Sequence, residues 1–305
     1  MADAMITLII GMIAGAVRVG TPYLFVSLGE CITEKSGRVN LGLEGILIFG
    51  AMSGYATSFL TQSPWIGVGC AAAVGLLLGL LHGGVCSLPR VNDIAFGIAL
   101  MLLGTGFAFF LGKPYIQPQA PQLPNLDLGV WSSDVRWRSA LAVNALFPIG
   151  IGLALLLHWG LRSTAVGLAL RLVGDHEGTA RALAYPVATV RIVATAVGGA
   201  FAGIGGAYLS LCYPGSWSEG LSSGQGIMAV ALVIFARWRP LGCLAASLLF
   251  GAAGALGPAL QSIGIRWGYH LFNALPYALT LAILIIRSRP RQTLSGAPGE
   301  LALTR

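Results

Sequence analysis

Apolar segments of about twenty residues follow one another along almost the whole chain, and they limit the fold more than any other feature. They lie near residues 5–27, 39–60, 65–88, 93–112, 141–161, 192–213, 225–236, 241–262 and 271–286. Most of them have the length that a helix needs to cross the hydrocarbon core of a bilayer, whereas the 225–236 segment is short. Only 10% of the side chains are charged, and the mean hydropathy is +0.80. The sequence therefore predicts an all-α, polytopic transmembrane helical bundle with about nine spans, and eight or ten remain alternatives.

The distribution of basic residues predicts the orientation of this single membrane domain, residues 1–286. If the N-terminus is outside, most of the 18 Lys and Arg residues fall in cytoplasmic loops, as the positive-inside rule requires. The proline-rich segment 113–140 is then external. The mixed-charge segment 162–191 and the tail 287–305 are then cytoplasmic, and we expect the tail to be disordered. A re-entrant segment near the start would reverse the side of the N-terminus alone.

Two polar, glycine-rich stretches interrupt the apolar pattern, one in each half of the chain. They cover residues 36–45 and 216–226. Paired interruptions of this kind are typical of broken or re-entrant helices around a transport pathway. Glu44 is the sharpest candidate, because a carboxylate at membrane depth is costly unless it faces a cavity or a partner. The alternative is an acidic residue that stabilises a helix start near the interface.

Four further polar residues are weaker candidates for the substrate pathway. Each has an alternative role as a helix cap or in an interhelical hydrogen bond. These residues are Asn40, Asn92, Glu219 and Gln225.

The sequence argues against several other classes of protein. Neither Lys35 nor Lys113 lies in a phosphate-binding loop, so we expect no ATPase site on this chain. The five cysteines and four histidines are scattered without metal-ligand spacing, so we expect no metal and no cofactor. The G-x-S-x-G match at 220–224 lacks the strand-to-helix context of a catalytic serine. The basic residues lie between apolar runs rather than on one soluble face, which argues against nucleic-acid binding.

Glycines recur at helical spacing inside several apolar segments. Gly75, Gly79 and Gly83 are four residues apart, and Gly199 and Gly203 repeat the spacing. Small residues in this pattern allow membrane helices to approach closely. We expect tight packing between the helices that carry them.

The order of these motifs resembles the permeases of ATP-binding-cassette importers of the branched-chain amino acid and ribose type. The opening motif reads GECITEKSGRVNLGLEG at 29–45, and a later one reads WSEGLSSGQGIMAVALVIFARWRPLG at 217–242. Leu-Pro-Tyr at 275–277 also matches. The subgroup that carries nucleosides and simple sugars fits best, and the resemblance covers residues 20–287. Asp93 and Met101 stand where this subgroup usually has Gln and Asn.

The resemblance also places a segment that couples the permease to its ATPase. It is similar to GDHEGTARALA at 174–184, although Glu177, Arg181 and Ala184 depart from the usual Pro, Asp and Gly. The residues carried over as ATPase-coupling residues are Gly174, Asp175, His176, Glu177, Ala180 and Arg181.

The resemblance implies a transport subunit in the bacterial inner membrane rather than an enzyme. It implies a cytoplasmic ATPase that uses ATP and Mg, a second homologous permease, and a periplasmic or lipoprotein substrate-binding protein. The expected cargo is a nucleoside or purine-like compound, and a simple sugar is the alternative. An ion-coupled secondary transporter would also explain the spans and the broken helices.

Overall fold

The computed structural model describes the chain except for residues 1, 117, 213, 264–274, 288–296 and 304–305. It is an all-α bundle, as predicted from the apolar periodicity. The longer helices are α1 (Ala2–Lys35), α2 (Leu43–Thr61), α3 (Pro64–Cys86), α4 (Asp93–Gly112), α6 (Leu146–Ser163), α9 (Val187–Leu211) and α11 (Pro240–Ser262). The shorter ones are η1 (Lys113–Tyr115), α5 (Val135–Ala140), α7 (Ala165–Asp175), α8 (Glu177–Ala182), α10 (Gln225–Phe235), α13 (Leu275–Arg287) and α14 (Gly299–Leu303).

Seven helices in the described part of the chain are long and apolar enough to cross a membrane. The prediction was about nine spans, some of them broken or re-entrant, and two of the predicted segments are shorter than a full span in the described part of the chain. The 225–236 segment forms α10, which has only 11 residues and reaches about 16 Å, roughly half a bilayer core. The described part of the last segment, α13, has 13 residues. Because the break at 216–226 ends where α10 begins, α10 is a half-length helix.

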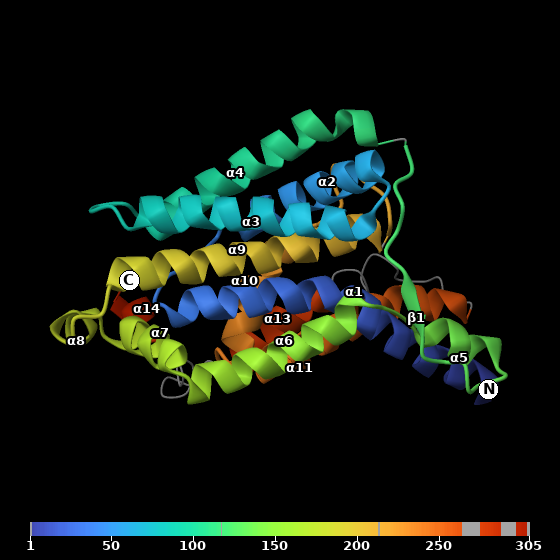
Figure 1. Ribbon diagram of the computed structural model, residues 1–305. Coiled ribbons are helices and arrows are strands. Elements are labelled where there is room, and N and C mark those ends of the chain that lie inside the picture. Colours follow the sequence, from blue (N-terminus) through green and yellow to red (C-terminus); the bar gives the residue numbers. More distant parts are fainter. Residues whose placement is uncertain (1, 117, 213, 264–274, 288–296, 304–305) are drawn as a thin grey trace.

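The first helix is longer than the apolar pattern indicated. It continues to Lys35 through the polar residues Glu30 and Glu34, and its 34 residues extend over about 51 Å. Arg18 donates a hydrogen bond to the Ser139 carbonyl oxygen (2.9 Å), which joins α1 to the segment 113–140. Figure 1 shows the N-terminus beside α5 and the C-terminus at the opposite end with α7 and α8. The segments expected on opposite sides of the membrane thus lie at opposite ends of the bundle.

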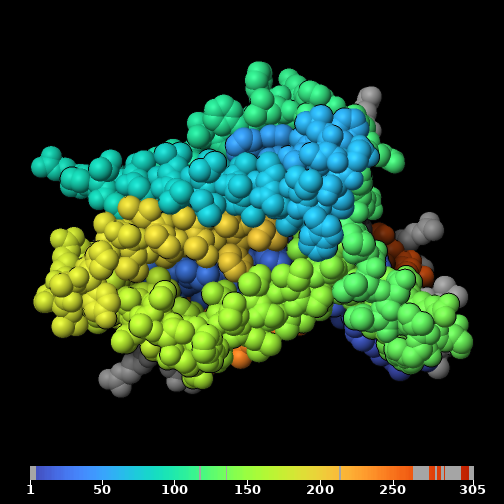
Figure 2. All heavy atoms as spheres, viewed as in Figure 1, coloured from blue at the N-terminus to red at the C-terminus, as the bar shows by residue number. Residues whose placement is uncertain are grey.

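The segment 113–140 folds over one end of the bundle (Figure 2). β1 (Asn125–Asp127) pairs antiparallel with β2 (Ala142–Asn144), and α5 lies between them in the chain. The Tyr55 and Ser58 hydroxyls of α2 donate to the carbonyl oxygens of Pro118 and Pro121, both at 2.9 Å. These contacts fix the proline-rich part of the segment to α2.

Helix α9 is the centre of the bundle, with α1, α2 and α3 packed around it. Figure 1 shows it between α3 and α1, with α4 along one edge and α6 and α11 along the other. Its glycines face those of α3: a Cβ atom at Gly75 would lie 2.2 Å from the Gly199 carbonyl oxygen. The close packing expected from the glycine spacing is therefore present between α3 and α9.

The outer helices expose large apolar side chains. Leu77 of α3, Phe110 of α4 and Leu156 of α6 are 62%, 73% and 57% exposed. In a soluble protein such surfaces would be unstable in water, whereas lipid is a suitable solvent for them.

The tail departs from the expectation of disorder where the structure describes it. Residues Gly299–Leu303 form α14, and Leu301 packs against a buried cluster that contains Leu24 and Trp238. The Glu300 carboxylate accepts the Glu177 N–H (2.7 Å) and lies 3.7 Å from Arg191. Apolar contact and charge pairing together order this part of the tail.

The α3–α9 contact predicts that Gly75→Ala will destabilise the protein. The added methyl group overlaps the α9 backbone, and overpacking of this kind costs about 1–3 kcal/mol. Gly69→Ala, on the same helix, places its methyl group in open space and serves as the matched control. The midpoint of thermal unfolding in detergent should fall for Gly75→Ala only, and equal midpoints would contradict the packing argument.

Candidate functional site

The two predicted breaks meet at the side chain of Glu44. This residue lies in the first turn of α2, and its side chain points to the start of α10, which follows the second break. Its Oε1 atom accepts hydrogen bonds from the Ser222 hydroxyl and from the Gly224 N–H (3.0 Å), and its Oε2 atom accepts the Gly226 N–H (2.6 Å). Glu44 is only 7% exposed. One carboxylate therefore caps the N-terminus of a helix that is distant in sequence.

The local sequence explains why α10 depends on this distant cap. Its N-cap residue is Gly224, in the left-handed conformation (φ 82°), and it provides no capping side chain. The first N–H groups of a helix have no partners within the helix. A carboxylate supplies both hydrogen-bond acceptors and a negative charge that the helix dipole favours.

Close backbone contact holds this junction together. A Cβ atom at Gly226 would lie 2.6 Å from the Glu44 Cα atom, so only glycine fits there. Next to Glu44, a Cβ atom at Gly45 would lie 2.7 Å from the Met101 Cα atom of α4. Since Met101 is near the middle of α4, the Glu44 junction lies near the middle of a membrane-spanning helix.

Tyr277 and Ser222 belong to this junction, although we did not predict them as site residues. The Tyr277 hydroxyl of α13 donates to the Ser223 carbonyl oxygen (2.8 Å). Leu-Pro-Tyr at 275–277 and the 217–242 motif both contribute to the family resemblance, but the sequence does not indicate that they meet. The break of the second half is thus held from α2 and from α13.

Asn40 and Gln225 flank the junction and are both partly unsatisfied. Asn40 is buried: its N–H donates to Glu30 Oε1 (2.8 Å), and its Oδ1 accepts the Gly42 N–H (2.9 Å). Asn40 Nδ2 and Gln225 Oε1 are buried and make no hydrogen bond within the described part of the chain. Polar atoms of this kind near a break are suited to contact a polar solute.

Asn92 and Glu219 lie elsewhere. Asn92 is exposed at the start of α4, where its side chain accepts the N–H groups of Ile94 and Ala95, so its geometry is that of a helix cap. Next to it, Asp93 forms an ion pair with Arg38. Glu219 is exposed in the loop before α10.

A pair of buried carboxylates near the end of α1 was also not predicted. Glu30 and Glu34 are 0% and 2% exposed and lie one helical turn apart. Glu30 accepts the Asn40 N–H, and Glu34 accepts a hydrogen bond from the Trp238 indole. These contacts connect α1 to the first break and to the α10–α11 turn. The sequence feature that could have indicated the pair is the presence of two acidic residues at the end of an apolar run.

The proposed coupling residues form a helical corner between α7 and α8. A Cβ atom at Gly174 would lie 2.1 Å from the Lys35 carbonyl oxygen, which places this corner directly against the end of α1. His176 caps α8 through Nδ1, which accepts the Thr179 N–H (3.2 Å). Ala180 is fully buried, whereas Asp175 is exposed. The corner is fixed on its inner side and open on its outer side.

Glu177 anchors α8 to the bundle. Its carboxylate bonds to Arg191 Nη1 (2.7 Å) at the start of α9 and to Arg181 within α8. Partial burial opposes its ionisation, but the two arginines outweigh this effect and hold the pKa of the Glu177 carboxyl below its ordinary value. The main contacts of Glu177 are therefore within the chain, while Arg181 remains 70% exposed.

Comparison with known proteins gives a consistent result along most of the chain. Residues 12–287 match the family described as the branched-chain amino acid transport system / permease component. No solved structure gives a significant match.

Three relatives are similar over most of their own length. A putative glucose ABC transporter permease protein of Haloferax volcanii is 32% identical, over 84% of this chain and 79% of its own. A guanosine ABC transporter permease protein of Bacillus subtilis is 30% identical, over 86% and 87%. A nucleoside ABC transporter permease protein of Lactococcus lactis is 28% identical, over 90% and 91%.

The matched range contains most of α1, the six other long apolar helices, the junction at Glu44 and the corner at α7 and α8. The chain therefore belongs to the permease component family of branched-chain amino acid-type transport systems, as a multi-pass protein of the cell membrane.

Proposed function

We propose that this chain is the permease subunit of an ATP-binding-cassette importer and forms the translocation pathway for a small polar solute. The observation that carries this proposal is the junction at Glu44, where two helix breaks meet near the middle of the bundle. Broken helices at this depth are typical of solute pathways in transporters. Transport then proceeds by alternating access between two states, driven by a separate ATPase.

The proposed cargo is a nucleoside or a purine-like compound. Two of the relatives are a guanosine and a nucleoside permease protein. A simple sugar is the alternative, because a putative glucose permease protein is 32% identical. The buried, unpaired amide atoms of Asn40 and Gln225 are suited to either cargo.

The proposed partners are a cytoplasmic ATPase, a second homologous permease and an extracytoplasmic substrate-binding protein. ATP and Mg are used by the ATPase, and we expect no hydrolysis by this chain. Helix α8 is suited to receive the ATPase, because Arg181 and Leu183 are 70% and 60% exposed beside its anchored inner face. Movement of α8 would reach α9 through Arg191.

Transport by the reconstituted complex tests this proposal against an ion-coupled transporter. With the permeases, ATPase and binding protein in proteoliposomes, uptake of radiolabelled guanosine or glucose should require ATP. It should persist when ionophores collapse the proton and sodium gradients. Uptake by this chain alone, driven by either gradient, would refute the importer assignment.

Replacing Glu44 by Gln should lower transport more than assembly. The amide oxygen accepts hydrogen bonds at one position, but the amide NH₂ group faces another N–H donor at the start of α10. We expect a loss of about tenfold in uptake rate, corresponding to one unsatisfied buried group. Co-purification of the ATPase reports assembly, and Asp127→Asn, at the exposed external strand, is the control. If the Glu44→Gln complex takes up solute as fast as the unaltered complex, the Glu44 carboxylate is not required for transport.

Charge reversal at Asp175 should weaken binding of the ATPase. Asp175 is exposed beside α8, so Asp175→Lys changes the outer side of the corner and leaves the Glu177–Arg191 pair intact. The affinity measured by co-purification should fall about fivefold, the scale of one exposed charge contact. Asp127→Lys makes the same change at the opposite end and should have no effect. Unchanged co-purification for both variants would remove Asp175 from the coupling surface.

A further inference from the structure

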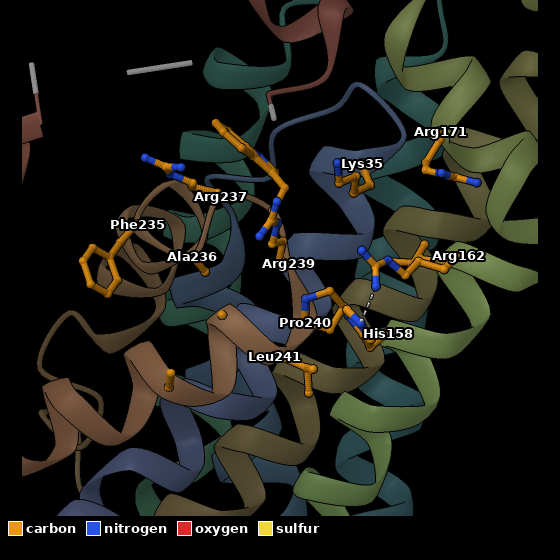
Figure 3. A pocket seen from close by; sticks show the side chains of 14 residues that line it. Lys35, His158, Arg162, Arg171, Phe235, Ala236, Arg237, Arg239, Pro240 and Leu241 are labelled. Carbon is orange, nitrogen blue, oxygen red and sulfur yellow. Dashed lines mark hydrogen bonds between the residues drawn. The ribbon is translucent and has the colours of Figure 1, made fainter. Parts of the chain in front are cut away.

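A strongly basic pocket lies at the end of the bundle that carries α7 and α8. Its volume is about 750 Å³, and it opens between the end of α1, the α6–α7 corner and the turn from α10 to α11. Five cationic residues line it: Lys35, Arg162, Arg171, Arg237 and Arg239. None of its described lining residues is acidic. Figure 3 shows Lys35, Arg162 and Arg239 around its centre, with Arg171 and Arg237 at opposite edges.

Gathering these cations has an energetic cost. The positive charges of the four arginines repel one another across the cavity, and the described lining residues include no carboxylate. Within the described part of the chain, Arg162 contacts His158, whose Nε2 atom is 3.4 Å from Arg162 Nη1, and a histidine carries no negative charge. A bound anion would convert this repulsion into attraction.

The turn that carries two of these arginines is held rigidly. Arg237 and Trp238 both adopt the left-handed conformation, each with φ 52°, which costs free energy for residues other than glycine. Trp238 between the arginines is only 4% exposed, and its indole N–H donates to Glu34 of α1. The buried Trp238 therefore fixes the positions at which Arg237 and Arg239 leave the backbone.

The start of α11 adds a second positive feature to the same pocket. Arg239 is the N-cap residue, no side chain caps the helix, and its first turn contains no acidic residue. Leu241 and Gly242 of this first turn line the pocket. An uncapped helix N-terminus favours a negatively charged group, above all a phosphate.

The surroundings of the pocket indicate lipid as the source of the phosphate. Trp159, one turn before the end of α6, is 59% exposed, as expected for an aromatic residue at the membrane surface. Leu155 and Leu156 on the same helix are also exposed, and Leu161 borders both the basic pocket and an apolar groove of about 560 Å³. Basic groups thus lie beside apolar surface at the level where headgroups and acyl chains meet.

We propose that this pocket binds the phosphate headgroup of an anionic phospholipid of the cytoplasmic leaflet, with its acyl chains against α6. Basic pockets between helix ends on the cytoplasmic side are suited to such headgroups. The bound phosphate bridges α1, the α6–α7 corner and the α10–α11 turn, which are far apart in sequence. This site is separate from the Glu44 junction and does not depend on the identity of the cargo.

Native mass spectrometry of the full chain, purified and delipidated in detergent, tests the proposal. Phosphatidylglycerol should bind more tightly than phosphatidylcholine of the same acyl chains. Arg239→Gln should lower the affinity for phosphatidylglycerol about fivefold, and Arg162→Gln with Arg239→Gln about thirtyfold. The double lysine variant, Arg162→Lys with Arg239→Lys, keeps the charge and should retain most of the affinity.

Arg90→Gln is the matched control, because Arg90 is exposed at the same end but does not line the pocket. It should leave the affinity unchanged, and the unfolding midpoint of each variant reports its folding. Equal binding of the two lipids, or an equal loss in Arg90→Gln and Arg239→Gln, would overturn the proposal. Inorganic phosphate that binds as tightly as phosphatidylglycerol would overturn the lipid assignment in favour of a soluble phosphate.

Discussion

The bundle depends on one constraint, which is that a helix beginning inside the membrane needs acceptors for its first N–H groups. The hydrocarbon core of a bilayer offers no hydrogen-bond acceptors, and an unpaired N–H group there costs several kcal/mol. Helix α10 begins directly after Gly224. Because Gly224 has no side chain, it cannot cap the helix. Glu44 meets the requirement from another helix, with its two oxygens bonded to Ser222, Gly224 and Gly226. A short helix and a buried carboxylate are thus each tolerated because of the other.

This arrangement explains the positions of the glycines around it. Gly226 allows the start of α10 to approach the backbone of Glu44, and Gly45 allows α4 to approach on the other side. The same device recurs between α3 and α9, where small residues bring whole helices together. Close approach therefore recurs between helices of the bundle, and at Glu44 it also joins the two breaks.

The end with α7 and α8 is organised by charge rather than by glycine alone. Arg191 at the start of α9 bonds to Glu177, to the Ser36 carbonyl oxygen (3.1 Å) and lies near Glu300. It therefore connects α8, the first break and α14 at one point. Ser36, which Arg191 contacts, precedes Glu44 by a few residues in the chain. A movement of α8 could therefore be transmitted through Arg191 and the first break to the Glu44 junction.

Local features of the sequence determined the fold class and the places where the helices are interrupted. Apolar length and helical spacing are properties of neighbouring residues, so the all-α bundle and both breaks could be predicted from them. Tertiary structure alone decided what each polar group contacts. It paired Glu44 with α10 and left Asn92 as a cap, and it joined Glu300 of the tail to α8. It also gathered Lys35, Arg162 and Arg239 into one pocket. The physical reason is that a hydrogen bond or an ion pair depends on distance in space, and residues separated by a hundred or more positions meet only when the helices have packed.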